Sequence, residues 1–508
     1  MVFIPRKKPA ALSAERNSVG NLATVPFCTG GWNTKDPLPS MPPQDAVILD
    51  NMIVENERIV SRAGYDEVAT GLEGEVESLF QFANANTTQI ISCAGTKIYK
   101  GLSPSVTQIG TGFTSARWQG LMMNQYLLLF NGADAPRKYD GTTLTTNTIT
   151  GSGLTSSDLV GATNYKNRLI AWENNACGFW YGDSDAISGT FTFFDLSFIT
   201  RRGGYVVACA SWSYDSSGGS GLQARLAIFM STGEAIVYEG TDPGTAESWS
   251  MVGRYKVAPP VSQRAIIELS GDILIVNKYD LISFSSVIQT GENPTTQSKL
   301  VGAIRAAVAA YGQNFGWELI NFPLGALIIV NVPTSTNSQY QQFVINTRSG
   351  GCSRFTGYNA RCFAVYNDLL YFGGLGTINQ ALIGESDNGA YIDIDAQASY
   401  SNLGTSKQKT LNYVMPYMAI DTDVSFSQAI NYDFLTRPLE STQLISVPGN
   451  LWDTFFWDTV YWSPESEIKY VQYGVSGQGI FVSWRIKAQI RQTVAFYNTL
   501  YSFEVDNL

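Results

Sequence analysis

The sequence predicts an all-β protein: a β-propeller of six or seven blades followed by a C-terminal antiparallel β-sandwich. Three observations lead to this fold class. A strand hairpin recurs along the first three quarters of the chain. The hairpins are spaced as propeller blades require, at about 40 residues each. After residue 388 the strands become longer and alternate apolar with polar residues, as in a sandwich that buries one face of each sheet.

The repeat consists of a short apolar strand, a polar turn, and a second strand that ends in aromatic-x-Gly. Four copies are clear: Gln89–Cys93 with Ile98–Gly101, Tyr126–Phe130 with Lys138–Gly141, Arg168–Trp172 with Trp180–Gly182, and Leu226–Met230 with Val237–Gly240. The closing glycines recur about every 40 to 60 residues, the length of one four-stranded blade. A single blade cannot bury both of its faces, so we expect the blades to stack around an axis.

Three more apolar hairpins, near residues 272–284, 324–345 and 368–372, bring the candidate blades to seven. We therefore divide the chain into an N-terminal arm and irregular segment (1–45), a propeller (46–388) and a sandwich (389–508). The alanine-rich stretch near 297–311 predicts one helix inserted in the propeller, with Ser298 as its N-cap. The longest alternating strand is expected over 479–490.

Composition indicates a protein with large contact surfaces. Charged residues make up 15% of the chain and aromatic residues 12%, and interface cores are poor in charge and rich in aromatic rings. The net charge of −10 argues against general nucleic-acid binding, because phosphate affinity comes from clusters of Lys and Arg. No apolar stretch is long enough for a membrane helix and no signal peptide is evident, so we expect folding in a cytoplasm.

The chain contains no histidine. This excludes Ser-His-Asp and Cys-His nucleophile systems as well as histidine-ligated zinc. No phosphate-binding glycine loop is present either. We expect no enzyme activity, no catalytic, cofactor-binding or metal-binding residue, and no cofactor. The alternative is a carbohydrate-binding or carbohydrate-cleaving propeller, since a glycosidase needs two carboxylates and no histidine.

Three aspartate pairs have the i, i+2 spacing that places both side chains on one face of a strand: Asp183/Asp185, Asp393/Asp395 and Asp421/Asp423. None belongs to a complete calcium loop, so we expect solvent-exposed strand or loop faces, and Ca²⁺ binding stays open. The cysteines show no CxxC pair and are expected to be buried free thiols. Cys352 and Cys362 are candidate neighbours across a hairpin, and their redox state stays open.

The densest aromatic cluster covers 451–462, from Leu451 to Trp462. Alternation would place about half of its rings in the sandwich core, and the others could contact a protein or stack on a sugar. Core packing and partner contact both remain open.

Two short motifs in the N-terminal part of the chain resemble those of a known protein family. Asp50-Asn51-Met52 followed by Arg62-Ala63-Gly64 resembles the opening of the tail hub or nozzle proteins of short-tailed bacteriophages, the family that includes packaged-DNA stabilisation proteins. Alanine at position 63 departs from the proline that is commoner there. The blade pattern and the C-terminal sandwich extend the resemblance to the whole chain.

The resemblance implies a structural virion protein. Its members form a hexameric ring below the portal and the head-to-tail adaptor protein, with a tail needle, fibre or tailspike at the far end. Genome DNA passes through the channel without specific binding, so we expect the acidic chain to repel it. The basic run Arg6-Lys7-Lys8 is expected to reach a neighbouring protein. The protein would be located in the virion tail after assembly in the host cytoplasm.

Overall fold

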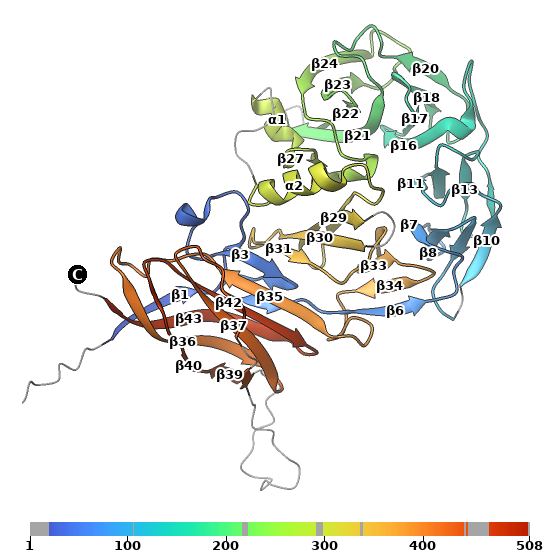
Figure 1. The fold of residues 1–508 in the computed structure, drawn as a ribbon. Helices are drawn as coiled ribbons and strands as arrows, with labels where there is room; N and C mark the ends of the chain where they lie inside the picture. The colour runs from blue at the N-terminus through green and yellow to red at the C-terminus, as the bar shows by residue number, and fades with distance from the viewer. Residues whose placement is uncertain are drawn as a thin grey trace, which may run out of the picture.

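The computed structural model describes residues 20–104, 106–215, 222–290, 298–335, 339–440, 443–445 and 467–505. Its strands form two bodies, a propeller and a sandwich, which lie side by side in Figure 1. The fold class expected from the sequence is confirmed.

Within these described ranges, six four-stranded blades and one three-stranded sheet follow one another around the propeller. The first two blades contain β7 (Val76–Ala83), β8 (Thr88–Ala94), β9 (Lys97–Lys100), β10 (Thr107–Thr111), and β11 (Gln119–Met123), β12 (Tyr126–Phe130), β13 (Arg137–Tyr139), β14 (Leu144–Thr146). The next two contain β16 (Leu159–Tyr165), β17 (Arg168–Glu173), β18 (Gly178–Ser184), β20 (Thr192–Asp195), and β21 (Val206–Asp215), β22 (Leu222–Met230), β23 (Glu234–Gly240), β24 (Trp249–Lys256).

The three-stranded sheet and the last two blades complete the ring. The sheet contains β25 (Ile266–Leu269), β26 (Asp272–Val276) and β27 (Leu281–Ser283). The blades contain β28 (Glu318–Phe322), β29 (Leu327–Ser335), β30 (Gln339–Asn346), β31 (Cys352–Phe355), and β32 (Phe363–Tyr366), β33 (Leu369–Gly373), β34 (Ile378–Ala381), β6 (Tyr65–Ala69). A further two-stranded sheet pairs β15 (Ile149–Thr150) with β19 (Gly189–Thr190).

The ring is closed by a strand from early in the chain. β6 pairs with β34, so the last blade takes its fourth strand from the segment that precedes the first blade. β32 of that blade packs against β7 of the first blade. The first strand of each sheet contacts the first strand of the next, so these strands surround the axis.

The recurring hairpins are the central strand pairs of their blades. β8 pairs with β9, β12 with β13, β17 with β18, and β22 with β23. Three of the closing glycines, Gly101, Gly141 and Gly240, have φ of 84°, 101° and 132°, values that side-chain-bearing residues rarely adopt. This explains why the motif ends in glycine at these turns.

The helix α2 (Val301–Tyr311) lies where the alanine-rich sequence predicts one. Its start differs in detail: Leu300 is the N-cap, while Ser298 instead donates its hydroxyl and backbone N–H to the Asp280 carboxylate. A second helix, α1 (Phe284–Thr290), begins where the sequence predicts the end of a strand. Among the described helices, none has the length and apolar character needed to cross a membrane.

The sandwich consists of two sheets. One is eight-stranded and contains β1 (Asn21–Pro26), β4 (Met52–Val54), β5 (Ile59–Ser61), β36 (Lys409–Ile420), β39 (Glu467–Tyr470), β40 (Tyr473–Gly474), β41 (Gln478–Gly479) and β43 (Val494–Val505). The other contains β2 (Gly31–Trp32), β3 (Asp45–Asp50), β35 (Ile392–Ala398), β37 (Val424–Tyr432), β38 (Gln443–Ile445) and β42 (Val482–Ile490). Because β3 also pairs with β31, this second sheet continues into a propeller blade as one ten-stranded sheet.

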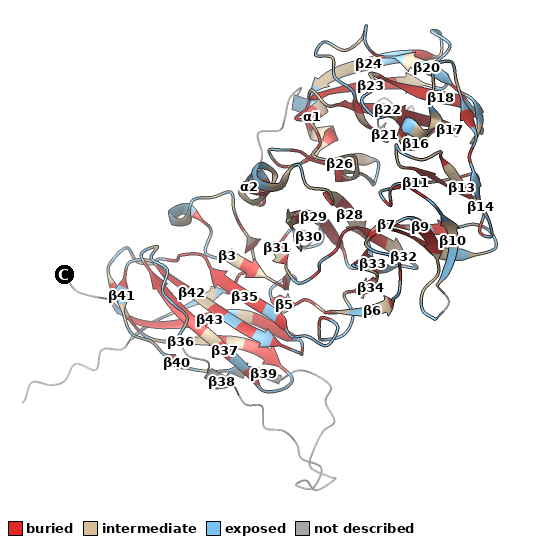
Figure 2. Cartoon of the chain, turned by 45° about the vertical axis from the view of Figure 1, so that its right-hand side comes forward, coloured by how far each residue is buried: buried red, intermediate tan, exposed pale blue. Residues whose placement is uncertain are grey.

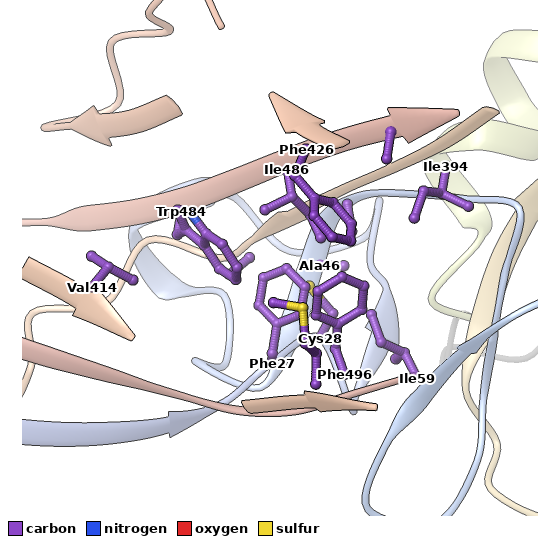
Figure 3. Packing of buried hydrophobic residues seen from close by; sticks show 14 of the residues in the cluster. Phe27, Cys28, Ala46, Ile59, Ile394, Val414, Phe426, Trp484, Ile486 and Phe496 are labelled. Atoms are coloured by element: carbon purple, nitrogen blue, oxygen red, sulfur yellow. The ribbon is translucent and has the colours of Figure 1, made fainter. Parts of the chain in front are cut away.

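The sandwich core includes side chains from both ends of the chain (Figure 3). The ring of Phe27 lies 4.8 Å from Trp484 and 5.5 Å from Phe496, centroid to centroid. Cys28 and Ala46 are buried in the same cluster.

Several segments pair in the structure with strands outside the region that the sequence predicts for them. Strand β1, in the segment expected as an arm, pairs with β43 over six residues. Strands β3, β4 and β5, in the segment expected to open the propeller, pair with strands of the sandwich or with one another. Period-two alternation predicts a strand but does not identify its neighbour, so these long-range pairings had no signal in the sequence.

Candidate functional site

The two motifs behind the resemblance meet in one buried cluster of polar side chains, which we call the junction. Arg62 is 2% exposed, and its guanidinium donates to both carboxylate oxygens of Asp387, at 2.7 and 2.6 Å. Its Nε donates to the side-chain oxygen of Asn51 at 2.9 Å, and the ring of Tyr358 lies 4.1 Å from its guanidinium carbon. A planar, five-donor guanidinium suits this bidentate and stacked geometry.

Asn51 is the centre of the junction. Its φ of 58° is left-handed, a conformation that asparagine tolerates better than most residues. The side-chain amide donates to the Thr356 hydroxyl at 2.8 Å and to the Asp393 carbonyl at 2.7 Å. Its oxygen accepts from the Thr356 N–H at 2.8 Å as well as from Arg62. Every donor and acceptor of this buried amide is therefore used.

The neighbouring motif residues are constrained as well. Asp50 accepts two hydrogen bonds from Arg354, at 2.7 and 2.6 Å. A Cβ on Gly64 would lie 1.8 Å from the Ser386 carbonyl oxygen, so only glycine fits there. The junction therefore joins the entry to β6, the end of β31 and the start of β35, which is where propeller and sandwich meet.

A half-buried arginine, Arg264, lies where the first strands of the blades converge. Arg264 donates to the Glu77 carbonyl at 2.9 Å, and to the Ser78 hydroxyl and the Trp118 carbonyl, each at 2.6 Å. The ring of Phe315 lies 5.3 Å from its guanidinium carbon. One side chain thus connects the first two blades with the segment before β25. Sequence reasoning missed Arg264, because it lies in no motif or repeat.

A hollow of about 150 Å³ lies beside the propeller axis, lined by Gln263, Trp172 and Glu268 among others. Burial raises the pKa of the Glu268 carboxyl, which also accepts the Ser211 N–H at 2.6 Å. Glu268 is the carboxylate that lines this hollow. Hydrolysis of a glycosidic bond requires a pair of carboxylates on either side of the sugar.

The aspartate pairs lie in three separate places. Asp183 and Asp185 are exposed, at the end of β18 and in the turn after it, where Asp185 has a φ of 60°. Asp421 and Asp423 are exposed in the turn between β36 and β37.

The third pair, in β35, does share one face of its strand. Asp395 forms a bidentate ion pair with Arg485 at 2.9 and 2.6 Å, and Asp393 accepts from the Gln489 amide at 2.9 Å. Across the part of the chain that the structure describes, no three Asp, Glu, Cys or His side chains gather in a way that could hold a metal ion.

The six cysteines are free thiols, and five of them are buried. Cys352 and Cys362 lie in different core clusters. Burial raises the pKa of the Cys352 thiol to about 12 and raises the pKa of the Cys362 thiol well above its ordinary value. The aromatic cluster 451–462 and the basic run 6–8 fall outside the described residues.

No family model matches this chain, and no curated protein does. Several solved structures are similar to it at low identity. Raptor from Chaetomium thermophilum is 10% identical with a TM-score of 0.38, over 64% of this chain and 29% of Raptor. An exo-β-1,3-galactanase from Phanerochaete chrysosporium is 11% identical with a TM-score of 0.29, over 86% and 99%. A putative 6-phosphogluconolactonase from Bacteroides fragilis is 11% identical with a TM-score of 0.33, over 67% and 91%.

Proposed function

We propose that this chain is a non-enzymatic structural protein of a bacteriophage virion, the tail hub or nozzle subunit of a short-tailed phage. It assembles in the host cytoplasm into a ring, expected to be a hexamer, below the portal and the head-to-tail adaptor. A needle, fibre or tailspike is the partner at the far end. The observation that carries this proposal is the junction, because the residues that give the resemblance are the ones that tie propeller to sandwich.

The junction supports a structural role through its chemistry. Arg62 and Asp387 use their hydrogen-bonding groups on each other and on neighbouring backbone or side-chain atoms. A buried charge pair of this kind fixes one geometry, because moving either part leaves an unpaired charge away from water. A subunit that transmits force between an adaptor and a tail tip needs such a fixed angle between its two bodies.

The propeller axis is a poor candidate for the genome channel. Arg264 reaches from the segment before β25 to β7 and to the entry of β11, and the two hollows that begin beside it measure about 150 and 460 Å³. A DNA duplex does not fit such a space. If the protein lines the genome channel, the channel is therefore formed between subunits of the ring.

The alternative of a carbohydrate-cleaving propeller has less support. The axial hollow, where the first strands of the blades converge, presents Glu268 and no second carboxylate in its lining. Assays of the purified protein on a panel of glycans, with and without EDTA, address this alternative. Turnover that disappears when one carboxylate pair is mutated would replace the structural proposal with an enzymatic one.

The experiment that tests the proposal is the copy number in the assembled particle. Electron cryomicroscopy of virions should place several copies of this chain, expected to be six, in a ring around the genome channel. Native mass spectrometry of the isolated chain is the companion measurement, since ring closure can require the adaptor as a template. Only one or two copies per particle, or none, would contradict the proposal.

A further inference from the structure

A hollow of about 820 Å³ lies on the outer face of the sandwich sheet formed by β35, β42 and β37, and we call it the sandwich groove. Successive side chains of a strand point to opposite faces of the sheet, so every second residue of these strands lines the floor of the groove. On β42, Lys487 and Gln489 are exposed while the neighbours between and beside them are buried. On β37, Ser425 and Ser427 line the same groove. Figure 2 shows β35, β42 and β37 together in the sandwich, coloured by burial.

The larger part of the surface that the groove offers is polar. The aliphatic residues of its lining, Val424, Ala488 and Ile490, belong to the sandwich core, so they contribute little beyond backbone. The aromatic contribution comes from Tyr391, which is 54% exposed. The groove therefore offers a lipid chain or an apolar peptide anchor only a minor apolar surface, whereas such anchors dominate the centres of protein interfaces.

The charges that line the groove balance. Two carboxylates, Asp393 and Asp423, stand with two cations, Lys487 and Arg491. Lys487 forms no ion pair with any described residue, although it lies opposite Asp395 in register. A strongly charged ligand of either sign would meet one like-charged pair, whereas a neutral ligand with many hydroxyl groups can donate to carboxylates and accept from cations.

One end of the groove is fixed by two side chains from the turn between β42 and β43. Gln492 is buried; its oxygen accepts from the N–H groups of Asp421 and Thr422, at 3.0 and 2.6 Å. Its amide donates back to the Thr422 carbonyl at 2.9 Å. Arg491 donates to the Gly389 carbonyl and lies 4.1 Å from the ring centroid of Tyr391.

Three chain connections are thus held together at this end of the groove before any ligand arrives. A preformed site loses less freedom on binding than a flexible one. We propose that the sandwich groove binds a neutral oligosaccharide, with Asp393, Gln489, Lys487 and the two serines as hydrogen-bonding groups. This inference does not depend on the proposed virion role, because it concerns the isolated chain.

The test uses the full-length chain with neutral and charged oligosaccharide arrays, followed by calorimetric titration of the best binder. We expect a neutral oligosaccharide to bind, with affinity about tenfold weaker in Lys487→Ala and in Gln489→Ala, the loss typical of one hydrogen bond to a charged or amide group. Ser425→Arg removes one of the proposed hydroxyl partners and fills the groove with a longer side chain, so it should weaken binding as well. Asn412→Ala is the matched control, an exposed change on the opposite sheet.

Thermal unfolding at the wild-type temperature in all four variants would show that the fold is intact. The proposal is overturned if no neutral oligosaccharide binds, if charged glycans are preferred, or if the three groove variants bind like the wild type. A protein partner whose binding the groove variants abolish, without any sugar binding, would also overturn it.

Discussion

Arg62 shows how a single side chain holds distant parts of this chain together. Its partners come from residues 51, 356, 358 and 387, which span most of the propeller in sequence. The aspartate at 387 is 9% exposed, so removing the guanidinium leaves a carboxylate with little access to water. Losing one partner of a buried pair is costly because the other charge remains.

We therefore expect Arg62→Leu to lower the free energy of unfolding by about 3–5 kcal/mol. Equilibrium urea denaturation followed by tryptophan fluorescence measures this loss. Arg58→Leu is the control, because Arg58 and its partner Glu55 both have side chains 44% exposed and such pairs contribute at most about 1 kcal/mol. Equal effects of the two changes would show that the junction is not the buried tie described above.

At the scale of elements, the N-terminal strand β1 and the residues after it are the clearest case of a segment whose partner is far away in sequence. β1 pairs with β43, and Phe27 then enters the core between Trp484 and Phe496. The aromatic side chain is 1% exposed, so its removal leaves a cavity among packed rings.

Phe27→Ala should lower the free energy of unfolding by about 3–5 kcal/mol, the usual range for an aromatic residue removed from a core. Leu22→Ala, on the adjoining strand β1 but 60% exposed, should change it by less than about 0.5 kcal/mol. Both values come from the same denaturation assay. Wild-type stability in Phe27→Ala would mean that the N-terminal segment does not pack in the sandwich.

At the scale of the whole molecule, the net charge predicts how the protein interacts with DNA. In the proposed ring, the formal charge of −10 would be repeated in every subunit, and like charges along a narrow channel add their fields. Such a wall repels phosphate, which suits a genome that slides past without being held.

The purified protein should therefore show no measurable affinity for duplex DNA at physiological salt, and no steep rise in affinity as the salt is lowered. Fluorescence anisotropy with a labelled duplex over a salt series measures both. Replacing Arg6, Lys7 and Lys8 with alanine should leave this result unchanged, since we expect these residues to contact protein. Tight, salt-sensitive binding by the wild type would contradict the channel role.

Local pattern was enough to predict much of the fold. Apolar runs ending in aromatic-x-Gly identified the central hairpins of four blades, because strand alternation and the left-handed conformation of a turn glycine are properties of adjacent residues. The alanine-rich stretch identified α2 for the same reason. The absence of histidine excluded whole classes of catalytic site without any coordinates.

Only the tertiary structure decided which segments meet. The pairing of β1 with β43, of β6 with β34, and of β3 with both β31 and β35 joins residues hundreds of positions apart. The Arg62 junction lies where such pairings bring β6, β31 and β35 together. Arg264 and the sandwich groove likewise depend on contacts between segments far apart in the sequence. The backbone groups along strand edges are chemically alike. Local sequence therefore predicts that a strand forms, but it does not identify the strand with which it pairs.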